Sequence, residues 1–266
     1  MVEIREESTE PAGSSPTSSG PSTSRQPPPP QPRNTLMDFL KDRTLDSINF
    51  ALRIVTIFFA LSYLLPLASA PVQRKAYFKA FAAAMATNAL RLQQRIGPVR
   101  LNMEFMQRLF TEDSCHYLLY SILFVLSEPI TMALLPIMIF AALQATNFFV
   151  TLMTAIGQNN SPVVPPLTRL IQNQTPNCLG IVACAEIFLA PALFASVLMG
   201  QTSLVTPIGY YRFLVMRYGS QRNPYTRQAF YQMRVSLDQV AANPSCPGLV
   251  RTFIYKSISF ISSLHR

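Results

Sequence analysis

Charged residues are scarce in this sequence, and four long stretches contain none. Asp, Glu, Lys and Arg make up 13% of the chain, against a share of about 25% in typical soluble domains. The uncharged stretches, rich in Leu, Ile, Phe, Ala and Met, are Ile54–Gln73, Ser114–Ser127, Pro129–Thr168 and Ile187–Tyr211. Three of them reach the ~20 residues that a helix needs to cross a ~30 Å hydrocarbon layer. The sequence therefore predicts an integral membrane protein.

Residues for common catalytic and metal-binding chemistry are also few. The chain has two histidines, His116 and His265, and its four cysteines form no CxxC pair. A His-based acid–base pair or a Cys–His dyad needs a facing partner. The neighbours Cys115 and His116 would point about 100° apart on a helix. There is no G-x-S-x-G motif and no glycine-rich phosphate loop. We predict no enzymatic activity, no catalytic residues, no metal site and no cofactor.

The composition divides the chain into three parts. Residues 1–35 hold eight prolines and seven serines without hydrophobic periodicity, which predicts a disordered cytosolic tail. Residues 36–218 contain the apolar stretches and form the predicted transmembrane domain. Residues 219–266 are basic and form the predicted cytosolic C-terminal region.

The predicted fold is all-α, with about four spanning helices, additional interfacial helices and the disordered tail. A break is expected at Pro71–Lys75 and a polar loop at Gly157–Asn177. Leu101–Asp113 and Ser203–Met216 are expected to form short interfacial helices. The expected spans are Phe50–Ala70, Tyr77–Leu92 (which could instead lie in the interface), Ile130–Ile156 and Leu179–Met199.

The apolar region Cys115–Ile156 is too long for one straight span. Its 42 residues would make a helix of ~63 Å at 1.5 Å per residue. Pro129 removes a backbone donor and should end or kink the helix there. Two alternatives follow: an interfacial piece followed by a span, or a wedge-like hairpin that enters and leaves one leaflet.

Positive charges predict the orientation in the membrane. The segment with Arg91, Arg95, Arg100 and Arg108 and the Arg-rich C-terminal region should face the cytosol. The segment 157–177 carries one charge and should be lumenal. Both termini are therefore expected in the cytosol.

The C-terminal region carries two apolar helical stripes. Phe230, Met233, Leu237 and Val240 recur on one helical face, and a second set follows after a break. Basic helices with one apolar face bind the membrane interface, although these two could also pack on each other as a small bundle. Anionic lipids or an acidic protein partner, rather than nucleic acid, are expected to contact this basic region. The remaining predicted interface residues are Val250, Arg251, Phe253, Ile254, Lys256, Ile258 and Ile261.

Acidic residues stand within or beside apolar segments at three places, Glu186, Glu128 and the pair Glu112–Asp113. A charge in a spanning helix is costly and usually faces a partner or a transport path. Glu186 could belong to an ion path or to a buried pair, for which Arg53 and Lys79 are the expected partners. We favour the buried pair, because transporters normally show several such groups and repeated halves.

Six segments, in consistent order along residues 44–264, carry a family resemblance. The longest is Glu112-Asp113-Ser114-Cys115-His116-Tyr117-Leu118-Leu119-Tyr120-Ser121. The others are Ala89–Leu92, Glu186–Leu189, Tyr210–Leu214, Arg222–Tyr225 and Ser257–Ser262. Together they resemble the transmembrane protein 33 family, also called the Krüppel homologue 2 family.

This resemblance implies a multi-pass protein of the endoplasmic reticulum and nuclear envelope without known catalysis. It also implies association with reticulon-type membrane-shaping proteins and nuclear pore components, in organising the tubular reticulum and distributing nuclear pores. Broken helices around Glu128–Pro129 and the C-terminal helices would wedge into the cytosolic leaflet. The alternative function is a small transporter or channel that uses Glu186.

Overall fold

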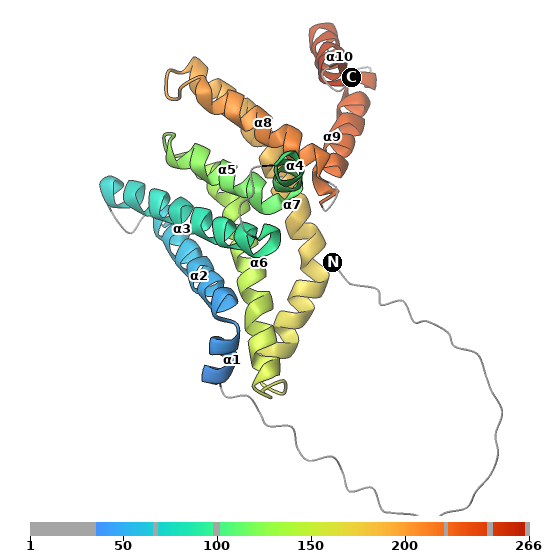
Figure 1. Ribbon diagram of the computed structural model, residues 1–266. Coiled ribbons are helices and arrows are strands. Elements are labelled where there is room, and N and C mark those ends of the chain that lie inside the picture. The colour runs from blue at the N-terminus through green and yellow to red at the C-terminus, as the bar shows by residue number, and fades with distance from the viewer. Residues whose placement is uncertain (1–35, 66–68, 98–101, 221–222, 244–246, 264–266) are drawn as a thin grey trace, which may run out of the picture. The chain divides into compact units, whose positions relative to one another are not determined.

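The computed structural model describes residues 36–65, 69–97, 102–220, 223–243 and 247–263, and the predicted disordered tail 1–35 lies outside this part of the chain (Figure 1). The regular elements of the described residues are all helices, as predicted. They are α1 (Leu36–Asp42), α2 (Thr44–Leu64), α3 (Ala70–Ile96), α4 (Met103–Thr111), α5 (Asp113–Val125), α6 (Thr131–Ala155), α7 (Val164–Leu198), α8 (Val205–Gly219), α9 (Tyr225–Ala242) and α10 (Gly248–Ser263).

Six of these helices form three sequential pairs, α2–α3, α5–α6 and α7–α8, which we call hairpins although α5 and α6 make few contacts along their lengths. α3 packs on α2 and α5, α5 packs on α8, and α8 packs on α7. α6 packs on both α2 and α7, which closes the circuit of contacts. α3, α5 and α8 therefore form one row of helices, and α2, α6 and α7 form the other. Segments far apart in sequence become neighbours in this way (Figure 1).

Aromatic rings and alanines fill the space between the two rows. Alanines on α3, such as Ala80 and Ala84, are buried and let neighbouring helices approach closely. Rings from α3, α5 and α8 pack beside them at centroid distances of 4.6 to 6.1 Å. The fully buried rings of this core are Tyr77, Phe81, Tyr120, Phe124, Tyr210 and Phe213.

Polar side chains link the start of α3, the α5–α6 turn and the start of α8. Arg74 at the start of α3 forms a 2.8 Å salt bridge with Glu128 in the α5–α6 turn. The hydroxyl groups of Ser127 and Thr206 lie 3.1 Å apart and join that turn to the start of α8. The α7–α8 turn contains Gly200, whose φ of 70° favours glycine. These polar contacts link neighbouring hairpins at this end.

Three helices, α2, α6 and α7, are long and apolar enough to cross a membrane. Large apolar side chains on them face outward, including Phe58 at 63% exposure and Phe194 at 58%. Extended apolar surfaces of this kind are rare on soluble monomers. The chain is a multi-pass membrane protein. α3 does not meet the same criterion among the described helices, so the predicted crossing near Tyr77–Leu92 stays a prediction.

The predicted breaks are partly right. The interruption at Pro129 is confirmed, because α5 ends at Val125 and α6 begins at Thr131. The break predicted at Pro71–Lys75 is wrong, since α3 begins one residue earlier with Pro71 in its first turn. Proline is tolerated there because the first backbone N–H groups of a helix have no acceptor within it.

The polar loop predicted at Gly157–Asn177 is also wrong over its second half. α7 begins at Val164 and runs 35 residues through Pro176 and Pro191. Two prolines follow Val164 directly and occupy the first turn, where they favour helix initiation. Polarity alone therefore indicated a loop where the chain is helical.

A glycine of α8, Gly209, faces a side chain of α5. A Cβ placed on Gly209 would lie 3.0 Å from the side chain of Leu123, whereas one on Gly180 in α7 would meet nothing within 4 Å. We expect Gly209→Leu to lower the free energy of unfolding by about 1–3 kcal/mol through overpacking. Gly180→Leu, the matched control, should not. Thermal unfolding in detergent tests this, and equal melting temperatures for the two variants would contradict the contact.

Candidate functional site

The carboxylate of Glu186 is completely buried and has two side-chain partners. One oxygen accepts a hydrogen bond from the hydroxyl of Tyr117 on α5. The other accepts a 3.3 Å hydrogen bond from Nε of Arg217 on α8. The hydroxyl of Tyr210 donates to the backbone oxygen of Glu186 at 2.7 Å. The acidic residue in α7 therefore connects three helices instead of facing lipid.

The Arg217 side chain is 1% exposed and contacts a second carboxylate. Its Nη1 lies 3.1 Å from Oδ1 of Asp113, which also accepts a 2.8 Å hydrogen bond from Ser220. The guanidinium lies 5.0 Å from the ring centroid of Tyr117, a cation–π distance. Burial by itself would lower the pKa of Arg217, but the facing phenol and two carboxylates outweigh burial and raise it above its usual range.

A second polar group lies where α3, α4 and α5 meet. Arg95 of α3 forms a 3.0 Å salt bridge with Glu112, which directly precedes α5. The ring of His116 is buried, with Nε2 2.7 Å from the backbone oxygen of Phe110. Burial, the largest effect, lowers the pKa of His116 and favours the neutral ring. These contacts hold the short helix α4 against the start of α5.

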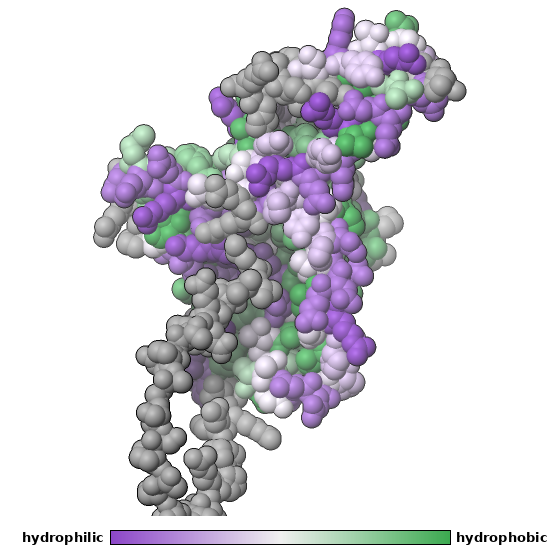
Figure 2. Space-filling view, turned by 90° about the vertical axis from the view of Figure 1, so that its right-hand side faces the viewer, coloured by the Kyte–Doolittle hydropathy of each residue, from purple (hydrophilic) through white to green (hydrophobic). Residues whose placement is uncertain are grey.

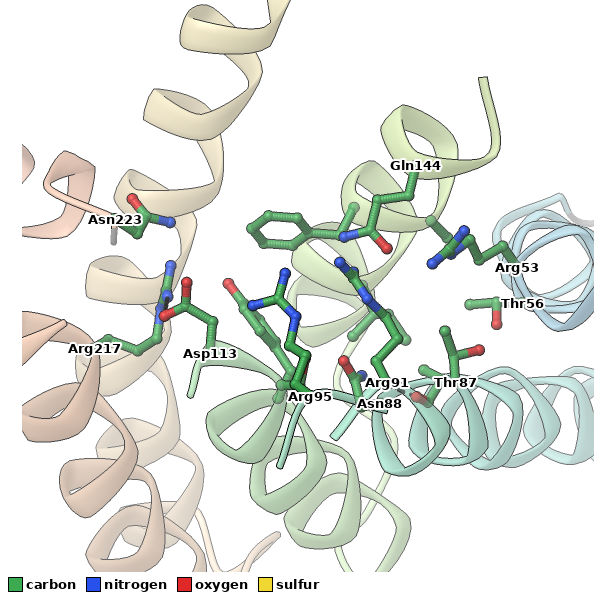
Figure 3. A pocket seen from close by; sticks show the side chains of 16 residues that line it. Arg53, Thr56, Thr87, Asn88, Arg91, Arg95, Asp113, Gln144, Arg217 and Asn223 are labelled. Atoms are coloured by element: carbon green, nitrogen blue, oxygen red, sulfur yellow. Dashed lines mark hydrogen bonds and ion pairs between the residues drawn. The ribbon is translucent and has the colours of Figure 1, made fainter. Parts of the chain in front are cut away.

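A cavity of about 130 Å³ lies beside this network (Figure 3). Its wall includes the guanidinium groups of Arg53, Arg91, Arg95 and Arg217, which come from α2, α3 and α8. The only carboxylate in the wall is Asp113, among the residues that the structure describes. Neutral polar groups complete the wall, including Asn88, Gln144, Asn223, Thr56 and Thr87.

The geometry gives Glu186 the role of a buried ion-pair partner, as we favoured from the sequence, but the basic residue that pairs with it is a different one. The predicted pairing of Glu186 with Arg53 or Lys79 is wrong, because Arg217 is its basic partner. Arg53 lines the cavity, and Nζ of Lys79 lies 5.1 Å from the ring centroid of Phe59. Sequence patterns missed Arg217 because a partner 31 positions away is set by helix packing and not by helical spacing.

Glu128 and Glu186 occupy different environments. The side chains of Glu128 and Arg74 are each 55% exposed, so their pair is a surface contact of the kind that contributes little stability. No group of three or more His, Cys, Asp or Glu side chains in the described part of the chain could hold a metal ion. Within these residues the polar network offers ion pairing and no recognised catalytic arrangement.

The predicted interface residues of α9 and α10 are partly covered by protein. Phe230 and Met233 pack around Ala183, Ile187 and Ala229, which joins α9 to α7. Ile254 in α10 is buried, and Lys256 is exposed. The side chain of Arg251 donates to the backbone oxygen of Asn243 at 3.2 Å.

The rest of the predicted C-terminal surface is less covered. Leu237 is half-buried and Val240 is 52% exposed. Figure 2 shows mainly hydrophilic residues with scattered hydrophobic ones where α9 and α10 lie, at the top of the view. The side chains of Val250, Phe253, Ile258 and Ile261 lie outside the described part of the chain.

These features define a helical multi-pass membrane protein whose helices are joined by a buried charge network. The family model described as "Transmembrane protein 33/Nucleoporin POM33" matches residues 28–266. The chain belongs to this family, and the resemblance found in the sequence is confirmed.

Curated relatives match most of the chain. A "Transmembrane protein 33 homolog" of Caenorhabditis elegans is 46% identical over 231 residues, covering 86% of this chain and 85% of the relative. "Transmembrane protein 33" of Homo sapiens is 37% identical and covers 86% and 92%, respectively. "Krueppel homolog 2" of Drosophila melanogaster is 37% identical and covers 88% and 83%. No solved structure matches the chain.

The buried pair predicts a large loss of stability when one partner is removed. Glu186→Leu should lower the free energy of unfolding by about 3 kcal/mol or more, because it leaves the buried Arg217 with one carboxylate instead of two. Glu128→Gln, the surface control, should cost about 1 kcal/mol or less. Thermal unfolding of the purified protein in detergent measures both.

A double variant separates pairing from simple loss of packing. Replacing both partners, as in Glu186→Leu with Arg217→Leu, should recover part of the lost stability, because no uncompensated guanidinium remains. Strictly additive losses in the two single variants would contradict an energetic coupling between these side chains.

Proposed function

We propose that this protein is a non-enzymatic organiser of the endoplasmic reticulum membrane and nuclear envelope. In this proposal it helps to arrange the tubular reticulum and the distribution of nuclear pores. The family description includes a nucleoporin, which supports a place at the nuclear envelope. The polar network supports the non-enzymatic part, because its charged side chains are used to join helices.

The observation that carries the proposal is the shortness of one helix in each of two hairpins. α5 has 13 residues and α8 has 15, so they are ~20 and ~22 Å long at 1.5 Å per residue. Neither length spans a ~30 Å hydrocarbon layer. Each is joined to a long apolar helix, α6 or α7, by a turn with an exposed apolar residue, Leu126 at 81% and Met199 at 71%.

Short helices of this kind occupy one leaflet more than the other. When more apolar helix surface is inserted into one leaflet than into the other, the protein favours curved membrane. The basic helices α9 and α10 would add anionic lipid contacts at the cytosolic surface. We propose reticulon-type membrane-shaping proteins and nuclear pore components as partners, and both termini in the cytosol, because the family resemblance and the distribution of positive charge favour them.

Curvature preference is the direct test of this mechanism. Labelled full-length protein is reconstituted into giant vesicles with anionic lipid, and narrow membrane tubes are pulled from them. We expect about twofold or greater enrichment in the tube over the flat membrane, because wedged apolar surface relieves bending stress. Equal density in tube and vesicle would remove the curvature mechanism.

Paired variants in α10 locate the contribution of the C-terminal helices. Phe253→Asp with Ile258→Asp places charge on the predicted apolar stripe. This double variant should lower the ratio of protein density in the tube to that in the flat membrane toward one. Ser259→Asp adds a charge at an exposed position and should retain the enrichment. If the wild type and all variants are equally enriched in the tubes, the preference for curved membrane comes from the hairpins and does not require α10.

The alternative function, transport through Glu186, has a separate test. In the structure this carboxylate is fully buried and engaged by Tyr117 and Arg217, which favours a structural role. We therefore expect no ion or proton flux in reconstituted liposomes that depends on Glu186. A flux that Glu186→Gln abolishes in otherwise folded protein would establish the alternative.

A further inference from the structure

The arginines around the cavity differ in how their charge is balanced. Arg217 is paired with Glu186 and Asp113, and Arg95 is paired with Glu112. Arg53 and Arg91 line the same cavity, and neither makes a salt bridge to any carboxylate in the described ranges. The cavity therefore contains two guanidinium groups without a direct carboxylate partner in the described ranges, and the nearby Asp46 and Asp113 attract them only from a distance.

Arg53 is the more deeply placed of these two side chains. It is 8% exposed although it carries a full charge, and its buried Nε has no hydrogen-bond partner within the described residues. An unsatisfied buried donor costs about 1–3 kcal/mol, and more when the group is charged. Such a group lowers the stability of the protein unless a bound ligand supplies the missing hydrogen-bond acceptor.

Arg91 brings a second positive charge to the same space. Figure 3 shows the Arg53 and Arg91 side chains reaching from α2 and α3 into the space beneath Gln144. The neighbouring Arg95 repels the guanidinium of Arg91. Two guanidinium groups that face one cavity from different helices repel each other, unless an anion lies between them.

We propose that this cavity is a binding site for a phosphate monoester, held between Arg53 and Arg91. Guanidinium groups bind phosphate through paired N–H donors, and two of them match a dianion in charge and in number of donors. The volume of about 130 Å³ admits a tetrahedral oxyanion or several waters. The neutral side chains of Asn88 and Gln144 lie in the same wall and offer further donors.

The source of the phosphate is either a lipid headgroup or a soluble ion. Arg53 lies in α2, a candidate span, and the other wall residues come from helices that pack beside it. A phosphatidic acid headgroup would reach the two guanidinium groups from the membrane. Inorganic phosphate would reach them from the aqueous solution. The site does not depend on the curvature mechanism proposed above.

The test measures binding to purified full-length protein in neutral detergent. Titration calorimetry and thermal unfolding are followed with inorganic phosphate, with short-chain phosphatidic acid and with short-chain phosphatidylcholine, which has no monoester. We expect binding and a raised melting temperature with phosphatidic acid or with inorganic phosphate, each of which can carry two negative charges on one phosphate, but not with phosphatidylcholine. Stabilisation by phosphatidic acid and by inorganic phosphate assigns a site open to soluble phosphate, and stabilisation by phosphatidic acid alone assigns a lipid site.

Matched variants tie the binding to the two arginines. Arg53→Gln with Arg91→Gln should weaken binding about 100-fold, since two charge-assisted contacts are lost. Arg108→Gln with Arg212→Gln removes the same charge from exposed positions and should leave the affinity unchanged. Arg91→Lys keeps the charge but loses the paired donors and should weaken binding about tenfold.

The protein without ligand provides a second measurement. Because the cavity arginines repel each other when no anion is bound, the Arg53→Gln, Arg91→Gln variant should melt no lower than the wild type. A much lower melting temperature, together with unchanged monoester affinity in Arg91→Lys, would assign these arginines a structural role. Absence of monoester binding by the wild type, or equal binding by the cavity and control variants, would overturn the proposal.

Discussion

The ion pair between Glu186 and Arg217 ties the middle of an apolar helix to two helices distant in sequence. Glu186 is fully buried in α7, and its partners stand on α5 and α8. A charge at this depth is costly unless it is paired, and breaking a buried pair costs more than the pair contributes. The contact therefore specifies which helices become neighbours. The aromatic core and the cavity follow from that choice.

The turns obey a related constraint at the other end of the hairpins. Apolar side chains cannot by themselves fix one helix against another in lipid, because lipid tails offer an equally apolar environment. Polar contacts between turns, such as Arg74 with Glu128 and Ser127 with Thr206, supply specific links. Small residues on α3 let this helix pack closely against its neighbouring helices. These contacts add specificity to the packing of the hairpins, and apolar surface remains on the outside.

Hydropathy and proline placement predicted much of the fold. The apolar stretches became the cores of α2, α6 and α7, and Pro129 marked the break between α5 and α6. Polarity misled at 164–177, because a helix beyond the hydrocarbon can be polar and still satisfy its backbone internally. Pro71 misled because proline both interrupts helices and begins them. A proline in the first turn begins a helix and a proline further along interrupts it, so the position of the proline in the helix decides between the two effects.

The sequence by itself determined the membrane class, the family, most helix positions and the presence of a costly charge at Glu186. Each of these follows from local composition or from short ordered segments. Tertiary structure alone decided that Arg217 neutralises Glu186 and that Arg53 and Arg91 face one cavity. Helical periodicity relates residues within about two turns, whereas these partners lie on different helices. Their meeting depends on how α2, α3, α5, α7 and α8 pack, which no local pattern encodes.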